Sequence, residues 1–214
     1  MLVRLSLAAL AAALLATAPL AAKEKHRAEP VACSGVFGPG SSEAMLEDTF
    51  GAANVETGIV PGPEGSEMLA TTIFAADPAR RLQFGWYDED ALAYPSFVKL
   101  SPGQAAPGGA RIGMRPADIE KLNGAPFAIG GFWWDYGGYA NIEEGAFAGK
   151  LEGGCYLSIR FAPADDLPES VDVTPVSGEV QVPSGDPLLD RIGTRVQELT
   201  LAYPWPDDLP RPEY

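Results

Sequence analysis

The chain has 214 residues, of which 46% are hydrophobic and 21% are charged. This composition excludes collagen, a coiled coil and a fully disordered polymer. The 15 Lys and Arg side chains against 29 Asp and Glu give a formal net charge of −14. Such an acidic excess argues against a surface that neutralises nucleic acid or anionic lipid, so we expect no nucleic-acid partner.

The N-terminus predicts export. One basic residue, Arg4, precedes an apolar run over 5–20, and two alanines follow before Lys23. This order is typical of a secretory signal peptide over 1–22. A retained membrane anchor is the alternative, but an Ala-rich run of this length barely reaches the roughly 20 residues that a span needs. We expect a periplasmic or secreted protein with no stable membrane anchor, whose mature chain starts with the charged segment 23–34.

The two cysteines, Cys33 and Cys155, predict one disulfide, because exported chains fold in an oxidising compartment. Two free thiols are the alternative. Cys33 does not follow the apolar run directly, as a lipid-attached cysteine would, so we expect no lipid there. Neither cysteine has a His or another Cys nearby in the sequence, which argues against a metal site or thiol catalysis.

Two segments bounded by glycines, 40–51 and 113–124, predict short helices that start 73 residues apart. The first has a hydroxyl cap, an early acidic residue and a terminal glycine that can take a positive φ. In the second, Pro116 lies in the first turn, where proline is tolerated, and Ile119 occupies the position of Leu46 in the first.

Each predicted helix is followed by segments that alternate apolar with small or polar residues, the pattern of strands with one buried side. These segments are 68–75 and 82–88 after the first helix, and 146–151 and 156–161 after the second. Because strands and helices repeat at nearly the same offset, we predict tandem units over 35–110 and 111–162. Chance similarity between short glycine-bounded helices is the alternative.

The expected fold class is therefore α+β, with two tandem units of a short helix packed on an antiparallel sheet that together present a partly open sheet surface. Residues 163–214 hold 9 of the 20 prolines and form an acidic, Pro-rich extension. Within this extension we expect strands over 179–182 and 196–201, a helical turn over 186–193, and a final segment over 203–212. That last segment is either an extended strap held by Tyr203 and Trp205 or a loose tail.

The glycine-bounded helix signals, with Gly124-Ala125-Pro126 closing the second, resemble the helix ends of a group of small envelope proteins. The group is typified by the β-lactamase inhibitory protein and the small lipoprotein of the outer-membrane barrel-assembly machine. The resemblance covers roughly residues 35–162 and implies tandem units that bind other proteins, although this chain lacks the lipid-attachment signal. The stretch 131–138 also resembles one found in exported bacterial proteins. No functional residue is carried over from either likeness.

The sequence lacks the residues that several classes of catalytic and metal-binding site require. The only histidine is His26, in the charged segment, so Ser-His-Asp and Cys-His catalysis are not expected. No P-loop or dinucleotide fingerprint occurs. Acidic turns at 88–90 and 165–166 offer oxygen ligands for calcium, but the spacing of a calcium loop is absent, so we expect no metal and no cofactor.

The most informative segment is the aromatic run from Phe132 to Tyr139. Trp and Tyr give a large contact area with a polar edge, and exposed clusters of them are typical of binding hot spots. Aromatic residues flanked by glycines also serve as core plugs where strands cross, and that is the alternative here. The candidate binding residues are Trp133, Trp134, Asp135, Tyr136 and Tyr139, with Trp86 and Tyr87 beside them.

The sequence thus predicts an exported, non-enzymatic protein that binds a protein partner, and the acidic charge favours a basic one. One alternative is a glycan-binding protein or a carboxylate-dependent hydrolase that uses segment 132–144, where Asp135 lies near Glu143 and Glu144. A structural envelope protein without a ligand is the other.

Overall fold

The computed structural model describes residues 29–211 and contains three α-helices and eleven strands in that range. The helices are α1 (Glu43–Phe50), α2 (Pro116–Asn123) and α3 (Pro187–Arg191). The strands are β1 (Glu29–Pro30), β2 (Val55–Pro61), β3 (Glu67–Ile73), β4 (Leu82–Asp88), β5 (Ala93–Lys99), β6 (Gln104–Ala105), β7 (Ala128–Gly130), β8 (Ala140–Asn141), β9 (Tyr156–Ala162), β10 (Gln181–Pro183) and β11 (Arg195–Ala202). The predicted signal peptide and His26 lie outside the described residues.

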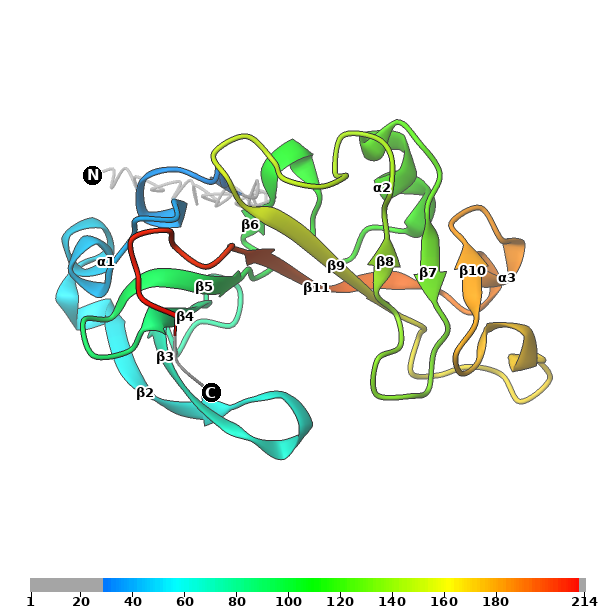
Figure 1. The fold of residues 1–214 in the computed structure, drawn as a ribbon. Helices are drawn as coiled ribbons and strands as arrows, with labels where there is room; N and C mark the ends of the chain where they lie inside the picture. The colour runs from blue at the N-terminus through cyan, green and yellow to red at the C-terminus, as the bar shows by residue number, and fades with distance from the viewer. Residues whose placement is uncertain (1–28, 212–214) are drawn as a thin grey trace, which may run out of the picture.

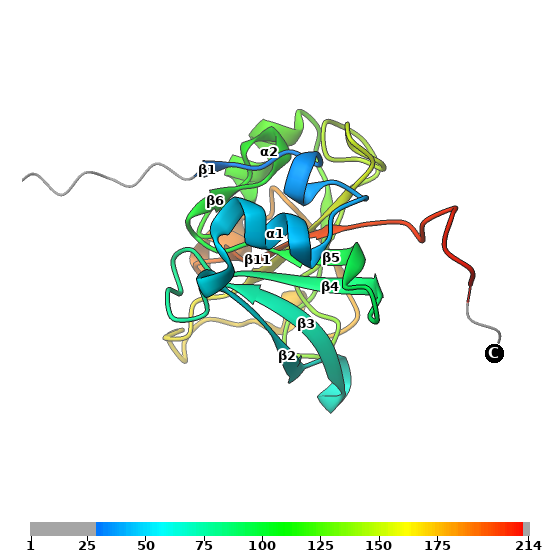
Figure 2. The same ribbon diagram turned by 90° about the vertical axis from the view of Figure 1, so that its left-hand side faces the viewer.

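A six-stranded antiparallel sheet in the order β2-β3-β4-β5-β11-β9 forms the body of the molecule. Helix α1 lies against one face of this sheet, on the side of β3 and β4 (Figures 1 and 2). A smaller antiparallel sheet, β10-β7-β8, stands at the other end of the molecule with α2 and α3 beside it (Figure 1). The fold is therefore mixed helix and antiparallel sheet, as the sequence predicts.

One face of the large sheet carries the core. Phe84 pairs with Val98, and Val98 pairs with Leu201, so these side chains point to the same side of three neighbouring strands. All three are fully buried, as is Leu46 of α1, and they belong to one hydrophobic cluster. Burial of each such side chain stabilises the fold by about 1.5 to 3 kcal/mol.

The opposite face of the sheet is only partly covered. Gly85, which pairs with Phe97, lies on this side, and the Phe97 ring occupies the space that a side chain at Gly85 would need. Lys99 and Glu198, on the neighbouring strands β5 and β11, form an ion pair of 3.1 Å. Phe97 is half-buried and Lys99 is exposed, so this face mixes apolar and charged side chains.

Both helices predicted from glycine-bounded segments are confirmed. Ser42 caps α1 by accepting a hydrogen bond of 3.4 Å from the backbone N–H of Met45, and Gly51 follows its last turn with φ 84°. Gly124 ends α2 in the left-handed conformation, with φ 76°. The strands predicted over 68–75, 82–88, 156–161, 179–182 and 196–201 are confirmed as β3, β4, β9, β10 and β11, and the turn over 186–193 as α3.

The strand predicted over 146–151 is wrong, because this segment forms turns. Gly145 and Gly149 take positive φ values of 98° and 66°, which reverse the chain direction. The side chain of Asn123 binds across the turn: its amide donates to the Glu144 carbonyl oxygen at 2.9 Å, and its own oxygen accepts from the Phe147 N–H at 2.9 Å. The apolar residue that suggested a strand, Phe147, is instead a buried plug.

The tandem arrangement is not confirmed. The range 35–110 contributes β2 to β5 in consecutive order, whereas 111–162 contributes only β9 to the same sheet. Strand β11, from the range 163–214, lies between β5 and β9. The three predicted ranges therefore share one sheet.

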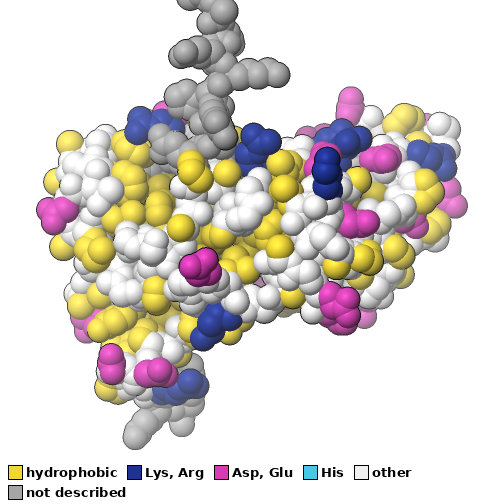
Figure 3. Space-filling model, turned by 90° about the horizontal axis from the view of Figure 1, so that it is seen from above, with side chains coloured by type: hydrophobic (Ala, Val, Ile, Leu, Met, Phe, Trp, Pro, Cys, Tyr) yellow, Lys and Arg dark blue, Asp and Glu magenta, His cyan; other side chains and the backbone are white. Residues whose placement is uncertain are grey.

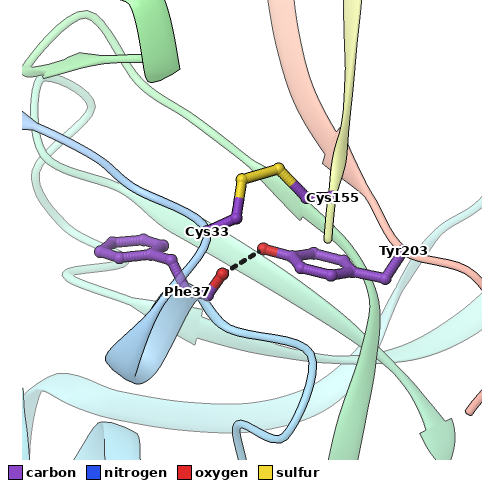
Figure 4. The surroundings of a disulfide bond; sticks show 4 residues. All are labelled: Cys33, Phe37, Cys155 and Tyr203. Carbon is purple, nitrogen blue, oxygen red and sulfur yellow. Dashed lines mark hydrogen bonds between the residues drawn. A yellow bond between two sulfur atoms is a disulfide. The ribbon is translucent and has the colours of Figure 1, made fainter. Parts of the chain in front are cut away.

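The final described segment is a strap rather than a loose tail. Tyr203 is buried, and its hydroxyl donates to the Phe37 carbonyl oxygen at 2.6 Å (Figure 4). Burial raises the pKa of the Tyr203 phenol far above its usual range. Trp205 packs on Tyr87 with ring centroids 4.7 Å apart, and the Tyr87 hydroxyl donates to the Tyr203 carbonyl oxygen at 2.6 Å.

The predicted disulfide between Cys33 and Cys155 is present, and both residues are buried (Figure 4). It links the segment before α1 to the residue that precedes β9, across 122 positions of sequence. A link over so long a loop removes much of the entropy of the unfolded chain.

The double variant Cys33→Ser/Cys155→Ser should lose about 4 to 5 kcal/mol in the free energy of unfolding, as expected for a closed loop of this length. Urea unfolding followed by circular dichroism measures the difference. Reducing the wild-type protein should lower its stability to that of the double variant, while reductant should leave the variant unchanged. A variant within about 1 kcal/mol of the oxidised wild type would contradict the stabilising role.

Candidate functional site

The aromatic loop, residues Phe132–Tyr139, connects β7 to β8. It begins at a buried anchor, because Phe132 is in the core. The backbone of Phe132 also makes two hydrogen bonds to the segment before β10: its N–H donates to the Val176 carbonyl oxygen at 2.7 Å, and its carbonyl oxygen accepts from the Gly178 N–H at 2.9 Å. The first residue of the run is therefore the core plug that the alternative interpretation expected.

The rest of the loop is fixed by hydrogen bonds to its own backbone. The indole N–H of Trp134 donates to the Gly131 carbonyl oxygen at 2.8 Å, and the Gly137 N–H donates to Trp134 at 3.0 Å. The Arg160 guanidinium, from β9, donates to the carbonyl oxygens of Gly137 at 2.9 Å and Asp135 at 3.3 Å. These hydrogen bonds hold the loop backbone in one conformation, and none of them uses the side chains of Trp133, Tyr136 or Tyr139.

Three aromatic side chains of the loop point to solvent. Trp133 is 54% exposed, Tyr136 is 57% exposed and Tyr139 is 39% exposed. Trp133 has φ 60°, a left-handed conformation that is costly for a large side chain. The hydrogen bonds around it maintain this conformation, and the indole is displayed at the surface.

Two further predicted residues lie in the same loop with different surroundings. Trp134 is half-buried, and its ring meets the Tyr136 ring edge-on at 5.6 Å. Asp135 is exposed. The five candidates of the aromatic loop are therefore brought together. Trp134 packs against the Tyr136 ring, and the other four side chains face outward.

The aromatic loop also contacts the hairpin of β2 and β3, at a tip that the sequence did not suggest. The Tyr136 hydroxyl donates to a carboxylate oxygen of Glu64, which has a positive φ of 54° in the turn between these strands. The hydrogen bond to Glu64 is the largest cause that raises the pKa of the Tyr136 phenol, followed by partial desolvation and the charge of Asp135.

Trp86 does not belong to this surface, which corrects its inclusion among the candidates. It is 5% exposed, and its indole N–H donates to the Thr71 hydroxyl at 2.9 Å inside the core. The alternation of apolar residues Leu82, Phe84 and Trp86 places all three on the buried face of β4. Tyr87, the next residue, points the other way and lies beside Trp205 instead of the aromatic loop.

Tyr87 and Trp205 line an open hollow of about 540 Å³ with the acidic turn 88–90. The Asp88 carboxylate accepts the Ala91 N–H at 2.9 Å, so it is occupied in shaping the turn. Within residues 29–211 no three His, Cys, Asp or Glu side chains are grouped as a metal site would require.

The carboxylates considered for hydrolysis do not lie in a pocket. Asp135, Glu143 and Glu144 are all exposed to solvent. A general acid in a glycosidase is usually held in an apolar pocket, which this arrangement does not provide.

Trp133→Ala should change the free energy of unfolding by less than about 1 kcal/mol, because the side chain is exposed, whereas Phe132→Ala should cost about 3 to 5 kcal/mol. Chemical denaturation of the two variants checks this contrast. Equal losses at the two positions would show that the Trp133 side chain carries structural packing.

The alkaline titration of Tyr136 should have its midpoint above the ordinary value of about 10. Because the folded pKa is raised, the Tyr136–Glu64 contact stabilises the fold below that value and is lost as the pH rises through the folded pKa. The difference in absorbance at 295 nm between wild type and Tyr136→Phe isolates this phenol. Glu64→Gln should move the midpoint back toward the ordinary value, and Glu143→Gln, an equal change elsewhere, should not.

Comparison with protein-family models, with curated proteins and with solved structures finds no match to this chain. The likeness to the envelope proteins with tandem units therefore stays a prediction. Among residues 29–211, no helix has both the length and the apolar character needed to cross a membrane.

Proposed function

We propose that this chain is an exported, non-enzymatic protein that recognises another protein through the aromatic loop. The observation that carries the proposal is the exposure of Trp133, Tyr136 and Tyr139 on a loop whose backbone is held by hydrogen bonds and a buried anchor. The disulfide supports a location outside the cytoplasm, either periplasmic or secreted.

The geometry of the loop suits binding because little order must be created on association. Exposed Trp and Tyr side chains give large contact areas with few rotatable bonds. They are enriched among interface residues whose truncation to alanine costs about 2 kcal/mol or more of binding free energy. A loop that is already fixed avoids most of the entropy loss of ordering a flexible segment. The left-handed backbone at Trp133 fits such a role, since strained residues cluster at functional sites.

The charge around the loop favours a basic partner. Asp135 within the loop and Glu64 beside Tyr136 place carboxylates next to the exposed rings. The cationic side chain of Arg160 contacts the loop, but it is engaged with loop carbonyl oxygens and lies over the Tyr139 ring at 5.0 Å. By contrast, the face seen from above in Figure 3 carries acidic and basic side chains at interspersed positions.

Glycan binding is the weaker candidate on the same residues. The hollow beside Trp133 and Trp134 has a volume of about 110 Å³. Small-molecule sites usually enclose about 300 to 1,000 Å³. The loop therefore offers a sugar a stacking surface without a pocket, whereas a protein partner needs only the surface.

The proposal is tested by retention of envelope proteins on the immobilised chain at low ionic strength. Trp133→Ala/Tyr136→Ala should reduce retention of the bound protein at least tenfold, since each truncation removes about 1 to 2 kcal/mol of binding free energy. Tyr156→Ala, which truncates an aromatic residue on β9 that is 39% exposed, should leave retention unchanged.

Raising the salt concentration should weaken the retention further, because charge attraction is screened. Retention that the double variant leaves unchanged would contradict the proposal, as would an extract from which nothing is retained. Quenching of tryptophan fluorescence by soluble peptidoglycan fragments, with no protein retained, would favour the glycan alternative.

A further inference from the structure

The two edges of the six-stranded sheet differ in how they are covered. At the β9 edge, the Phe161 N–H donates to the Gly138 carbonyl oxygen at 2.7 Å, and Tyr139 forms a bridge with Arg160, so the aromatic loop continues the pairing there. At the opposite edge, β2 pairs with β3 on one side only. Figures 1 and 2 show β2 as the outer strand of a hairpin that extends away from the body of the molecule.

The hydrogen bonds at both ends of the hairpin show which backbone groups of β2 face outward. The Phe74 N–H donates to Asn54 at 2.9 Å, and the Gly62 N–H donates to Ser66 at 2.7 Å. In an antiparallel pair, hydrogen-bonded positions alternate along the strand. Even-numbered residues of β2 are therefore bonded to β3, and the N–H and C=O groups of the odd-numbered residues point to the free edge.

The outward groups form a short, regular ladder. They are the carbonyl oxygens of Val55, Thr57, Ile59 and Pro61 and the N–H groups of Thr57 and Ile59, since the Val55 N–H already donates to Ala52. Within the described range, no side chain or backbone group outside the hairpin accepts from the Thr57 or Ile59 N–H. Pro61 ends the ladder because it lacks an N–H.

Protection that is usual at sheet edges is sparse on this strand. Natural edges are commonly shielded by bulges, lysines or an overlying segment. The pairing of β2 with β3 runs over seven residues without a bulge. Ile59 is 63% exposed, and the space above Gly58 is open. An incoming extended chain therefore meets free hydrogen-bonding groups and one apolar side chain.

The charges along the edge select the kind of chain that fits. Glu43 of α1 contacts the Thr57 hydroxyl on one face of β2, and Glu56 is exposed on the other. Glu67 lies opposite Pro61 at the far end of the strand. Near the Val55 end, the Arg80 guanidinium lies over the Phe74 ring at 3.8 Å. A second copy of the chain would bring like charges together, which disfavours pairing of two β2 edges.

We propose that the free edge of β2 binds an extended, basic segment of a partner protein, which adds to the sheet as a seventh strand. Main-chain hydrogen bonds supply the contact, Lys or Arg side chains at alternate positions meet Glu56 on one face of the sheet, and the side chains between them lie on the face of Ile59. This surface goes beyond the proposed function, because it uses no residue of the aromatic loop. The Tyr136–Glu64 contact places the two surfaces next to each other at the hairpin tip.

The test uses three capped seven-residue peptides as probes: alternating lysine and valine, alternating glutamate and valine, and alternating lysine and proline. The lysine–valine peptide should slow amide hydrogen exchange at Thr57 and Ile59 at least tenfold, measured by NMR on the full chain. The glutamate peptide lacks the complementary charge, and the lysine–proline peptide lacks the N–H groups for a ladder. Neither should protect these amides.

Ile59→Pro removes an outward N–H without breaking a bond to β3, so it should weaken binding of the lysine–valine peptide at least tenfold. Ile59→Ala keeps the N–H and should weaken it less than threefold. Trp133→Ala/Tyr136→Ala should bind the peptide as the wild type does, which separates this inference from the proposed function.

Three results would overturn the inference. The first is absence of protection at Thr57 and Ile59 in the wild-type protein, a measurement that does not depend on any variant folding. The second is equal binding of the lysine–proline peptide, which would mean charge attraction without strand pairing. The third is protection that rises with protein concentration in the absence of peptide, which would make a second copy of the chain the occupant.

Discussion

The pairing of β11 with β5 on one side and β9 on the other is the constraint on which the fold depends. Leu201 lies opposite Val98 and Leu157, and Leu199 lies opposite Ile159, so one strand buries apolar side chains against both halves of the chain. Without β11, the strands β2 to β5 and the strand β9 would have no shared edge. The aromatic loop, which rests on β9 through Arg160, takes its position from the same pairing.

Helix ends that depend on neighbouring residues could be predicted from the sequence, and the pairing of strands far apart in the chain could not. Ser42 determines a helix start through its hydroxyl, and Gly51 and Gly124 determine helix ends through their positive φ, so both helices could be predicted. The insertion of β11 between distant strands leaves no local pattern, so the prediction of two tandem units did not include it. Strand β5 was missed because Pro95 interrupts its sequence. Nothing in the spacing of residues 146–151 distinguished a buried turn from a strand.

In the candidate site, too, features set by local sequence could be predicted and features set by long-range contacts could not. The alternation in β4 that identified the strand also placed Trp86 inside, and it could have removed this residue from the candidates. The glycines around Trp133 and Trp134 did not reveal which indole faces solvent, since that depends on bonds to Gly131 and Arg160. The role of Glu64 came from the structure alone, because its contact with Tyr136 joins positions 72 residues apart, and the free edge of β2 depends on the order of strands in the sheet.

The late position of β11 in the chain has a consequence for biogenesis. A chain that is synthesised from its N-terminus presents β5 long before Thr200, the partner of Lys99, has emerged. Until then the inner edge of β5 and the apolar face it shares with β4 stay uncovered, a state that favours aggregation or chaperone binding. The six-stranded sheet is therefore completed only when nearly the whole polypeptide is available.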